Sequence, residues 1–155
     1  MKRQSKRDVC FIILILLIIA VTVFILGNSV LSKTDSRGAS IGIAGLIKRI
    51  IDPHDRIDFE TFHHFIRKLA HFTEFGVLGA LYQSAVINRR RKTEGVMLFI
   101  PLFAVLFTAV CDEYLQLFTA RGSQVSDVIL DFCGSVCGIA AAALITGIII
   151  KKRSN

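Results

Sequence analysis

The chain has 155 residues, of which 53% are hydrophobic, and its formal net charge is +7. This composition is too apolar for an ordinary soluble domain, and the length leaves no room for a soluble domain beside a membrane bundle. The basic residues are grouped at the ends of apolar runs, which is typical of cytoplasmic membrane loops, so we expect no nucleic-acid partner. We therefore predict a single membrane domain over residues 1–155 with membrane lipids as partners.

The first predicted element is a transmembrane helix over residues 9–27, VCFIILILLIIAVTVFILG, which contains no charge. About 20 apolar residues are enough to cross the hydrocarbon core. This run is longer than the hydrophobic region of a signal peptide, and no convincing cleavage site follows it. We expect a retained anchor and not a cleaved signal.

The next segment, residues 28–68, contains two apolar patterns of helical spacing. Isoleucines recur at that spacing within residues 40–51, and after Asp52-Pro53 a second apolar pattern leads into residue 69. Both patterns predict short amphipathic helices in the outer membrane interface. The alternative is a loop with scattered apolar residues.

Three further apolar runs, residues 69–87, 95–118 and 127–150, complete a predicted all-α bundle of four transmembrane helices. The loop at residues 88–94 carries four basic residues, whereas the turn at residues 119–126 carries only Arg121. Because basic loops remain in the cytoplasm, we expect both termini in the cytoplasm and the turn outside.

Polar residues lie in the outer halves of the last three predicted spans. Ionisable groups in a membrane usually face the protein interior and mark function, so we predict one polar pocket open to the outer side. The structural alternative is that the outermost side chains extend to the lipid headgroups. The candidate pocket residues are Lys68, His71, Glu74, Asp112, Glu113, Gln116, Arg121, Ser126, Asp127 and Asp131.

Acids exceed bases in this predicted pocket. Some carboxyl groups must be protonated, paired or bound to a cation, since crowded buried charges are unfavourable. Such a pocket suits a cationic or hydrogen-bonding group, a divalent ion or a proton relay. His71 and Glu74 with Asp127 form only a weak candidate set for a divalent cation, because a lone His among acids is not typical of zinc. The sequence thus assigns no metal ligands and no cofactor.

Two glycines, Gly134 and Gly138, are spaced by one helical turn on the last predicted span. Small residues at this spacing let a second helix approach closely in a membrane. We predict that this face packs against another span.

At the polar positions the sequence resembles the VanZ-like family. The segments are KLAHFTEF at residues 68–75, DEYLQLFTARG at 112–122 and SDVILDFCGSVCG at 126–138. The family pattern reads K-x-x-H-F-x-E-[YF], D-E-x-x-Q-x-F-x-x-x-R and S-x-x-D-[VL]-x-x-N-x-x-G-x-x-x-G. Among the departures from this pattern, Asp131 stands where Asn is usual, and Thr119-Ala120 replaces Pro-Gly.

The resemblance implies a multi-pass protein of the bacterial cell membrane, related to a protein associated with low-level resistance to the lipid-tailed glycopeptide teicoplanin. The preferred interpretation is a non-enzymatic cell-envelope protein whose pocket binds a lipid-linked cell-wall component or a lipoglycopeptide. An intramembrane hydrolase or transferase acting on a lipid headgroup, and a small proton-coupled transporter, are the alternatives. No strong catalytic motif is present, and the sequence gives neither the catalytic residues nor the oligomeric state.

Overall fold

The computed structural model describes residues 2–30, 33–52, 54–89, 99–119 and 123–154, and every regular element within these ranges is an α-helix. The prediction of an all-α fold is therefore confirmed. The helices are α1 (Lys2–Val30), α2 (Lys33–Ile51), α3 (Phe59–Arg89), α4 (Phe99–Leu117) and α5 (Val125–Ser154).

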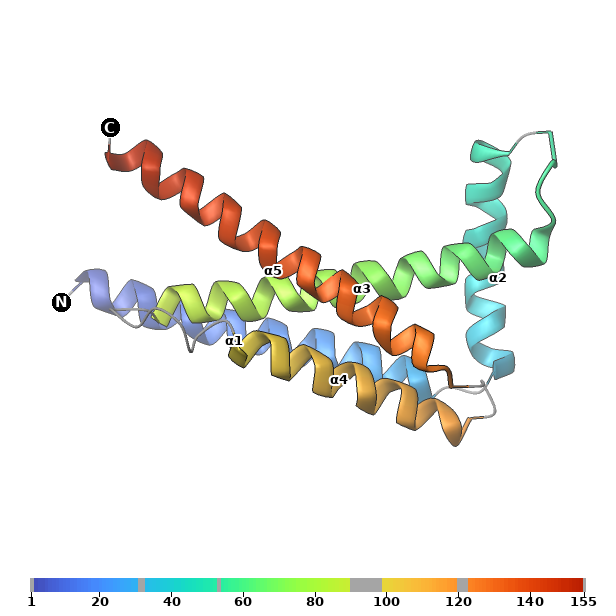
Figure 1. Ribbon diagram of the computed structural model, residues 1–155, viewed down its shortest axis with the longest axis horizontal. Coiled ribbons are helices and arrows are strands. Elements are labelled where there is room, and N and C mark those ends of the chain that lie inside the picture. Colours follow the sequence, from blue (N-terminus) through green and yellow to red (C-terminus); the bar gives the residue numbers. More distant parts are fainter. Residues whose placement is uncertain (1, 31–32, 53, 90–98, 120–122, 155) are drawn as a thin grey trace.

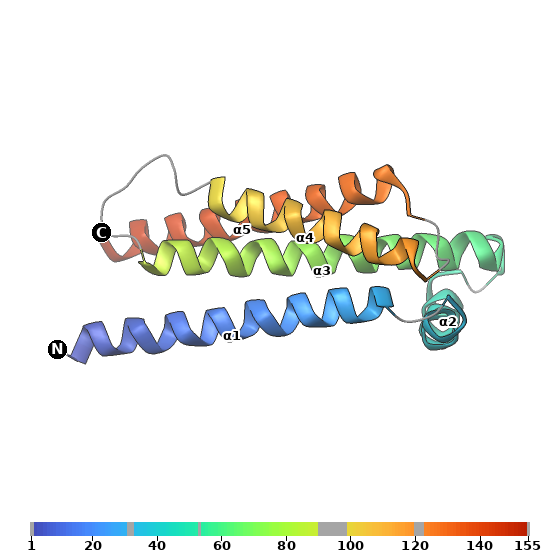
Figure 2. The same ribbon diagram turned by 90° about the horizontal axis from the view of Figure 1, so that it is seen from below.

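Four of the helices lie side by side and the fifth crosses one end of them. Figures 1 and 2 show α1, α3, α4 and α5 running roughly along the long axis of the molecule, with α2 set crosswise. The start of α1 and the end of α5 both lie at the opposite end, apart from each other (Figure 1). We call these two ends the α2 end and the terminal end.

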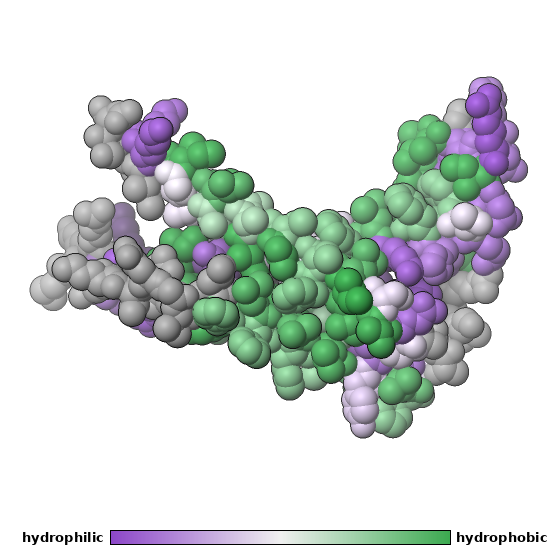
Figure 3. All heavy atoms as spheres, viewed as in Figure 1, coloured by the Kyte–Doolittle hydropathy of each residue, from purple (hydrophilic) through white to green (hydrophobic). Residues whose placement is uncertain are grey.

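Among the described residues, three helical segments are long and apolar enough to cross a membrane: Gln4–Val30, Phe99–Leu117 and Val125–Ile149. They indicate a membrane protein. Figure 3 shows apolar residues over the middle of the visible face and polar residues toward the α2 end. The predicted span at residues 69–87 lies within α3, where His71, Glu74 and Gln83 lower the hydropathy. A count of four spans therefore stays a prediction.

Helix α3 begins ten residues before the predicted span. The second amphipathic pattern does not form a separate helix, because no glycine or proline interrupts residues 59–75. Asp58 caps the joined helix, since its Oδ2 accepts a hydrogen bond from the backbone N–H of Thr61 at 3.1 Å. The prediction of two separate short helices is wrong for the second.

The apolar face of α2 is exposed. Ile43, Leu46 and Ile50 face away from the other helices, whereas Ala44 and Lys48 are buried. Helix α2 packs on α3. The apolar residues of the predicted amphipathic helix are thus available to a surrounding apolar phase.

Lys48 fixes the connection between α2 and α3. Its Nζ binds Asp55 and lies 3.4 Å from Asp52 Oδ2, and the hydrogen bond with Asp55 is the main cause of a raised Lys48 pKa. Asp52 accepts hydrogen bonds from the N–H groups of Ile57 and Arg56, at 2.8 and 3.0 Å. These bonds lower the pKa of Asp52, because they stabilise the ionised carboxylate.

The closest helix packing is between α3 and α5, which cross in Figure 1. A Cβ added at Gly134 would overlap the carbonyl oxygen of Phe72, and one added at Gly138 would overlap the carbonyl oxygen of Gly76. Gly79 faces the backbone of Ser135 in the same way. Only glycine permits this backbone separation, so the crossing sets how α5 presents its polar residues.

Candidate functional site

Five buried or half-buried polar residues from four helices meet toward the α2 end. We call them the buried cluster: Ser29 of α1, His71 of α3, Asp112 and Gln116 of α4, and Asp131 of α5. Four of them were predicted from the sequence. Polar side chains from α1, α3, α4 and α5 contact one another in this cluster.

Asp112 is the centre of the cluster and is fully buried. Its Oδ1 accepts a hydrogen bond from Ser29 Oγ at 2.5 Å, and its Oδ2 accepts one from Gln116 Nε2 at 2.9 Å. Two donors aimed at one carboxyl group are the arrangement that stabilises an ionised carboxylate. Asp112 is therefore held in one orientation by two neighbouring side chains.

His71 lies between the two aspartates. Its Nδ1 is 3.9 Å from Asp112 Oδ2 and 3.9 Å from Asp131 Oδ1. Asp131 is 1% exposed, and neither of its carboxylate oxygens has a hydrogen-bond partner. A buried polar group without a partner is costly and calls for a physical explanation.

Glu113 has a different position from the other predicted pocket acids. Its Oε2 accepts a hydrogen bond from the backbone N–H of Gln124 at 2.9 Å, and its Oε1 accepts one from Gln116 Nε2 at 3.1 Å. Because Gln124 directly precedes α5, this carboxylate ties the end of α4 to the start of α5. Glu113 thus positions the helices that carry Gln116 and Asp131.

The remaining predicted residues lie around the cluster or outside the described chain. Lys68 Nζ pairs with Asp127 Oδ1 at 3.0 Å, and both side chains are half-buried. Ser126 is exposed and bonds with Gln124 and Asp127. Glu74 is half-buried on α3, one turn after His71. Arg121 lies outside the described residues.

Ser29 is the cluster member that the sequence analysis missed. It lies two residues beyond the predicted end of the first span, and a serine there carries no sign of function. The available signal is weak: Ser29 continues the buried stripe of α1 formed by Ile18 and Ile25. Thr119, two residues after the end of α4, donates a hydrogen bond to the Ser29 carbonyl oxygen at 3.2 Å, which links the end of α1 to the chain that follows α4.

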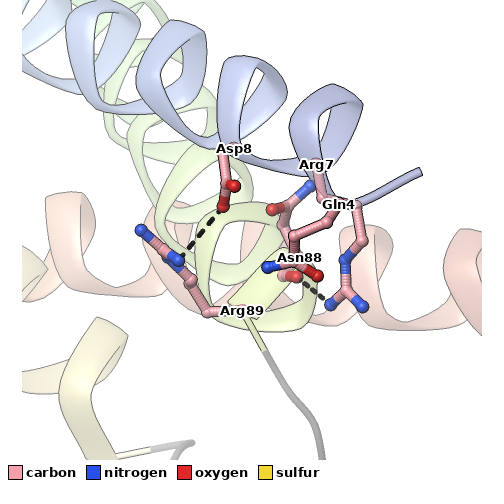
Figure 4. Close-up of a pocket in the computed structure, with 5 residues that line it drawn as sticks. All are labelled: Gln4, Arg7, Asp8, Asn88 and Arg89. Atoms are coloured by element: carbon pink, nitrogen blue, oxygen red, sulfur yellow. Dashed lines mark hydrogen bonds and ion pairs between the residues drawn. The ribbon is translucent and has the colours of Figure 1, made fainter. Parts of the chain in front are cut away.

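A second polar site lies at the terminal end. Its pocket of about 240 Å³ is lined by Gln4, Arg7, Asp8, Asn88 and Arg89 (Figure 4). Arg7 donates a hydrogen bond to the backbone carbonyl oxygen of Asn88, and Arg89 Nη1 lies 3.4 Å from Asp8 Oδ1. These contacts join the start of α1 to the end of α3, so we interpret this site as structural.

The buried cluster can accept hydrogen bonds from a ligand and can bind a positively charged group. Two carboxyl groups and an imidazole provide oxygen and nitrogen acceptors on three helices. A cation or a hydrogen-bond donor placed among them would supply the partner that Asp131 lacks.

Comparison with protein families gives one match. A family model described as VanZ/LLP1 matches residues 11–146, which include every described residue of the buried cluster. No curated protein and no solved structure matches the chain.

Proposed function

Because the chain belongs to the VanZ/LLP1 family, we propose that it is a bacterial cell-membrane protein whose buried cluster binds a polar headgroup. The headgroup belongs to a lipid-linked cell-wall component or to a lipoglycopeptide antibiotic, and binding contributes to resistance of the teicoplanin type. The observation that carries this proposal is the convergence of buried polar side chains from four helices. Each ionised group within a membrane costs at least ~2.5–3.5 kcal/mol, so such groups are kept where they serve a function.

The proposed membrane arrangement uses α3 as the fourth span. Helix α3 has 31 residues, which corresponds to ~46 Å at ~1.5 Å per residue, and it packs on α1, α4 and α5. Helix α3 also carries the ionisable residues His71 and Glu74. Ionisable residues of a span are expected on a helix that packs against other helices, as α3 does. The terminal end, with its basic residues, lies in the cytoplasm, and α2 rests in the outer interface with its isoleucines toward the lipid.

This orientation predicts a specific labelling pattern. In a background without Cys10, Cys111, Cys133 and Cys137, an impermeant maleimide added to intact cells should label Ser123→Cys and leave Ser5→Cys unlabelled. After the cells are opened, both positions should react, which controls for the reactivity of each thiol. Labelling of Ser5→Cys alone in intact cells would show that the protein has the opposite orientation.

A second candidate function is hydrolysis or group transfer on a lipid headgroup. It is favoured by one observation, the placement of His71 Nδ1 at 3.9 Å from two carboxylate oxygens. A histidine beside carboxylates can act as a general base. The two functions use the same buried cluster and the same class of bound molecule.

The test of binding is the set of lipids and cell-wall precursors that remain with the purified protein. Asp112→Asn keeps the shape of the side chain but removes the charge. Hydrogen bonds to charged groups contribute ~1.5–3 kcal/mol, so we expect retention of the bound molecule to fall roughly 10- to 100-fold. Native mass spectrometry of the wild-type protein and the Asp112→Asn variant measures the amount of bound molecule that each retains.

The matched control is Asp8→Asn, which makes the same chemical change at the terminal end. It should retain the bound molecule at the wild-type level. If Asp112→Asn and Asp8→Asn retain the same molecules in the same amounts, the buried cluster does not bind them and the proposed function is wrong.

A further inference from the structure

We propose that His71, Asp112 and Asp131 form a binding site for one divalent transition-metal cation, of the Zn²⁺ or Mn²⁺ type. This site goes beyond the proposed headgroup binding and does not depend on it. The ligands would be the imidazole of His71 and one carboxylate oxygen from each aspartate, supplied by α3, α4 and α5.

The geometry of the three donors is close to that of a bound site. One ligand atom from each residue lies within 4.8 Å of the other two, and both distances from His71 Nδ1 are 3.9 Å. Two donors that bind one ion at ~2.1 Å are at most ~4.2 Å apart. Side-chain rotations that move the donor atoms by less than ~1 Å would therefore bring all three within bonding distance of one ion.

Asp131 gives an independent reason for a ligand. Its side chain is almost completely buried, its two oxygens have no hydrogen-bond partner, and Oδ1 is directed toward His71. An uncompensated carboxylate in this position would be unstable, because burial removes its hydration. A cation between Asp131, His71 and Asp112 compensates the charge.

The surrounding side chains favour the same conclusion. Lys68, the basic residue one turn before His71, is already paired with Asp127 at 3.0 Å. Ser29 and Gln116 donate hydrogen bonds to Asp112, which is how neighbouring groups orient a carboxylate that binds a metal. The sequence offered a different candidate set for a divalent cation, His71 and Glu74 with Asp127. Because Asp127 is paired with Lys68, it is not included in the site proposed here.

The donor set limits the class of cation. The two carboxylate oxygens favour manganese, and the imidazole nitrogen also allows zinc, whose usual sites contain more His or Cys ligands. Metals that require thiolate ligands, such as Cu(I), have no sulfur ligand in this set. Three protein ligands leave at least one coordination position open for water or for an oxygen atom of a bound headgroup.

The test uses the full-length protein purified in detergent, treated with a chelator and freed of it. Zn²⁺ and Mn²⁺ are titrated separately by calorimetry, and the metal retained after gel filtration is measured by mass spectrometry. We expect one equivalent of one of these ions in the wild type. Loss of an outer-shell partner alone lowers metal affinity 10- to 100-fold, so Asp131→Asn, which removes a direct ligand, should weaken binding by at least ~100-fold.

Asp8→Asn is the control, because it removes a carboxylate of the terminal end and should bind the ion as the wild type does. Where Asp131→Asn does not fold, His71→Gln replaces it, and the metal-dependent rise in the wild-type melting temperature serves as the second measurement. Absence of a retained ion in the wild type, or equal affinity in Asp131→Asn, overturns the metal site. These titrations contain no lipid or antibiotic, so their failure leaves the headgroup proposal standing, whereas equal lipid retention in Asp112→Asn overturns that proposal alone.

Discussion

Replacing Gly138 with leucine is expected to abolish accumulation of folded protein in the membrane. A single added Cβ would overlap the carbonyl oxygen of Gly76 and crowd the backbone nitrogen of Ala80. These are backbone atoms of α3, so no side-chain rotation can relieve the overlap. Overpacking in a core costs ~1–3 kcal/mol where side chains can adjust, and the cost here should exceed that range.

The control for this prediction is Gly147→Leu, which places the same side chain on the same helix. A Cβ at Gly147 meets nothing within 4 Å. The amount of monodisperse protein extracted from membranes, together with its melting temperature, should be near wild type for Gly147→Leu and very low for Gly138→Leu. Equal behaviour of the two variants would show that α3 and α5 do not cross at these glycines.

The three most apolar helices, α1, α4 and α5, and the end that carries the polar residues could be predicted from the sequence for a simple physical reason. Uninterrupted apolar runs are rare outside membranes, and acids such as Asp112 and Asp131 within them are conspicuous because lipid penalises charge. The relative depth of these acids follows from counting residues along each run. These features depend on local sequence alone.

Other features depend on contacts between helices and were not accessible in this way. Ser29 joins the buried cluster because the end of α1 lies beside Asp112. Glu113 links the cluster residue Gln116 to the backbone of Gln124 because of the geometry of the α4–α5 connection. Lys48 is buried while neighbouring isoleucines are exposed, the reverse of the pattern of a soluble amphipathic helix.

The second large effect is expected for the function of the buried cluster in cells. Asp112→Asn and His71→Ala should each abolish protection against a lipid-tailed glycopeptide such as teicoplanin. Removing a hydrogen-bonding group of the buried cluster costs ~1.5–3 kcal/mol of binding free energy, so each variant should bind its ligand roughly 10- to 100-fold more weakly. The protein itself should still reach the membrane, because the α3–α5 glycine crossing is unchanged.

Survival at increasing teicoplanin concentration, in cells that hold equal membrane levels of each variant, is the most direct test of the claim that the buried cluster is a functional site. Asp8→Asn should protect as well as the wild type, since it lies at the terminal end. Asp112→Asn and His71→Ala should give the survival of cells that lack the protein. Full protection by both of these variants would contradict the claim and make the cluster a structural feature of the helix packing.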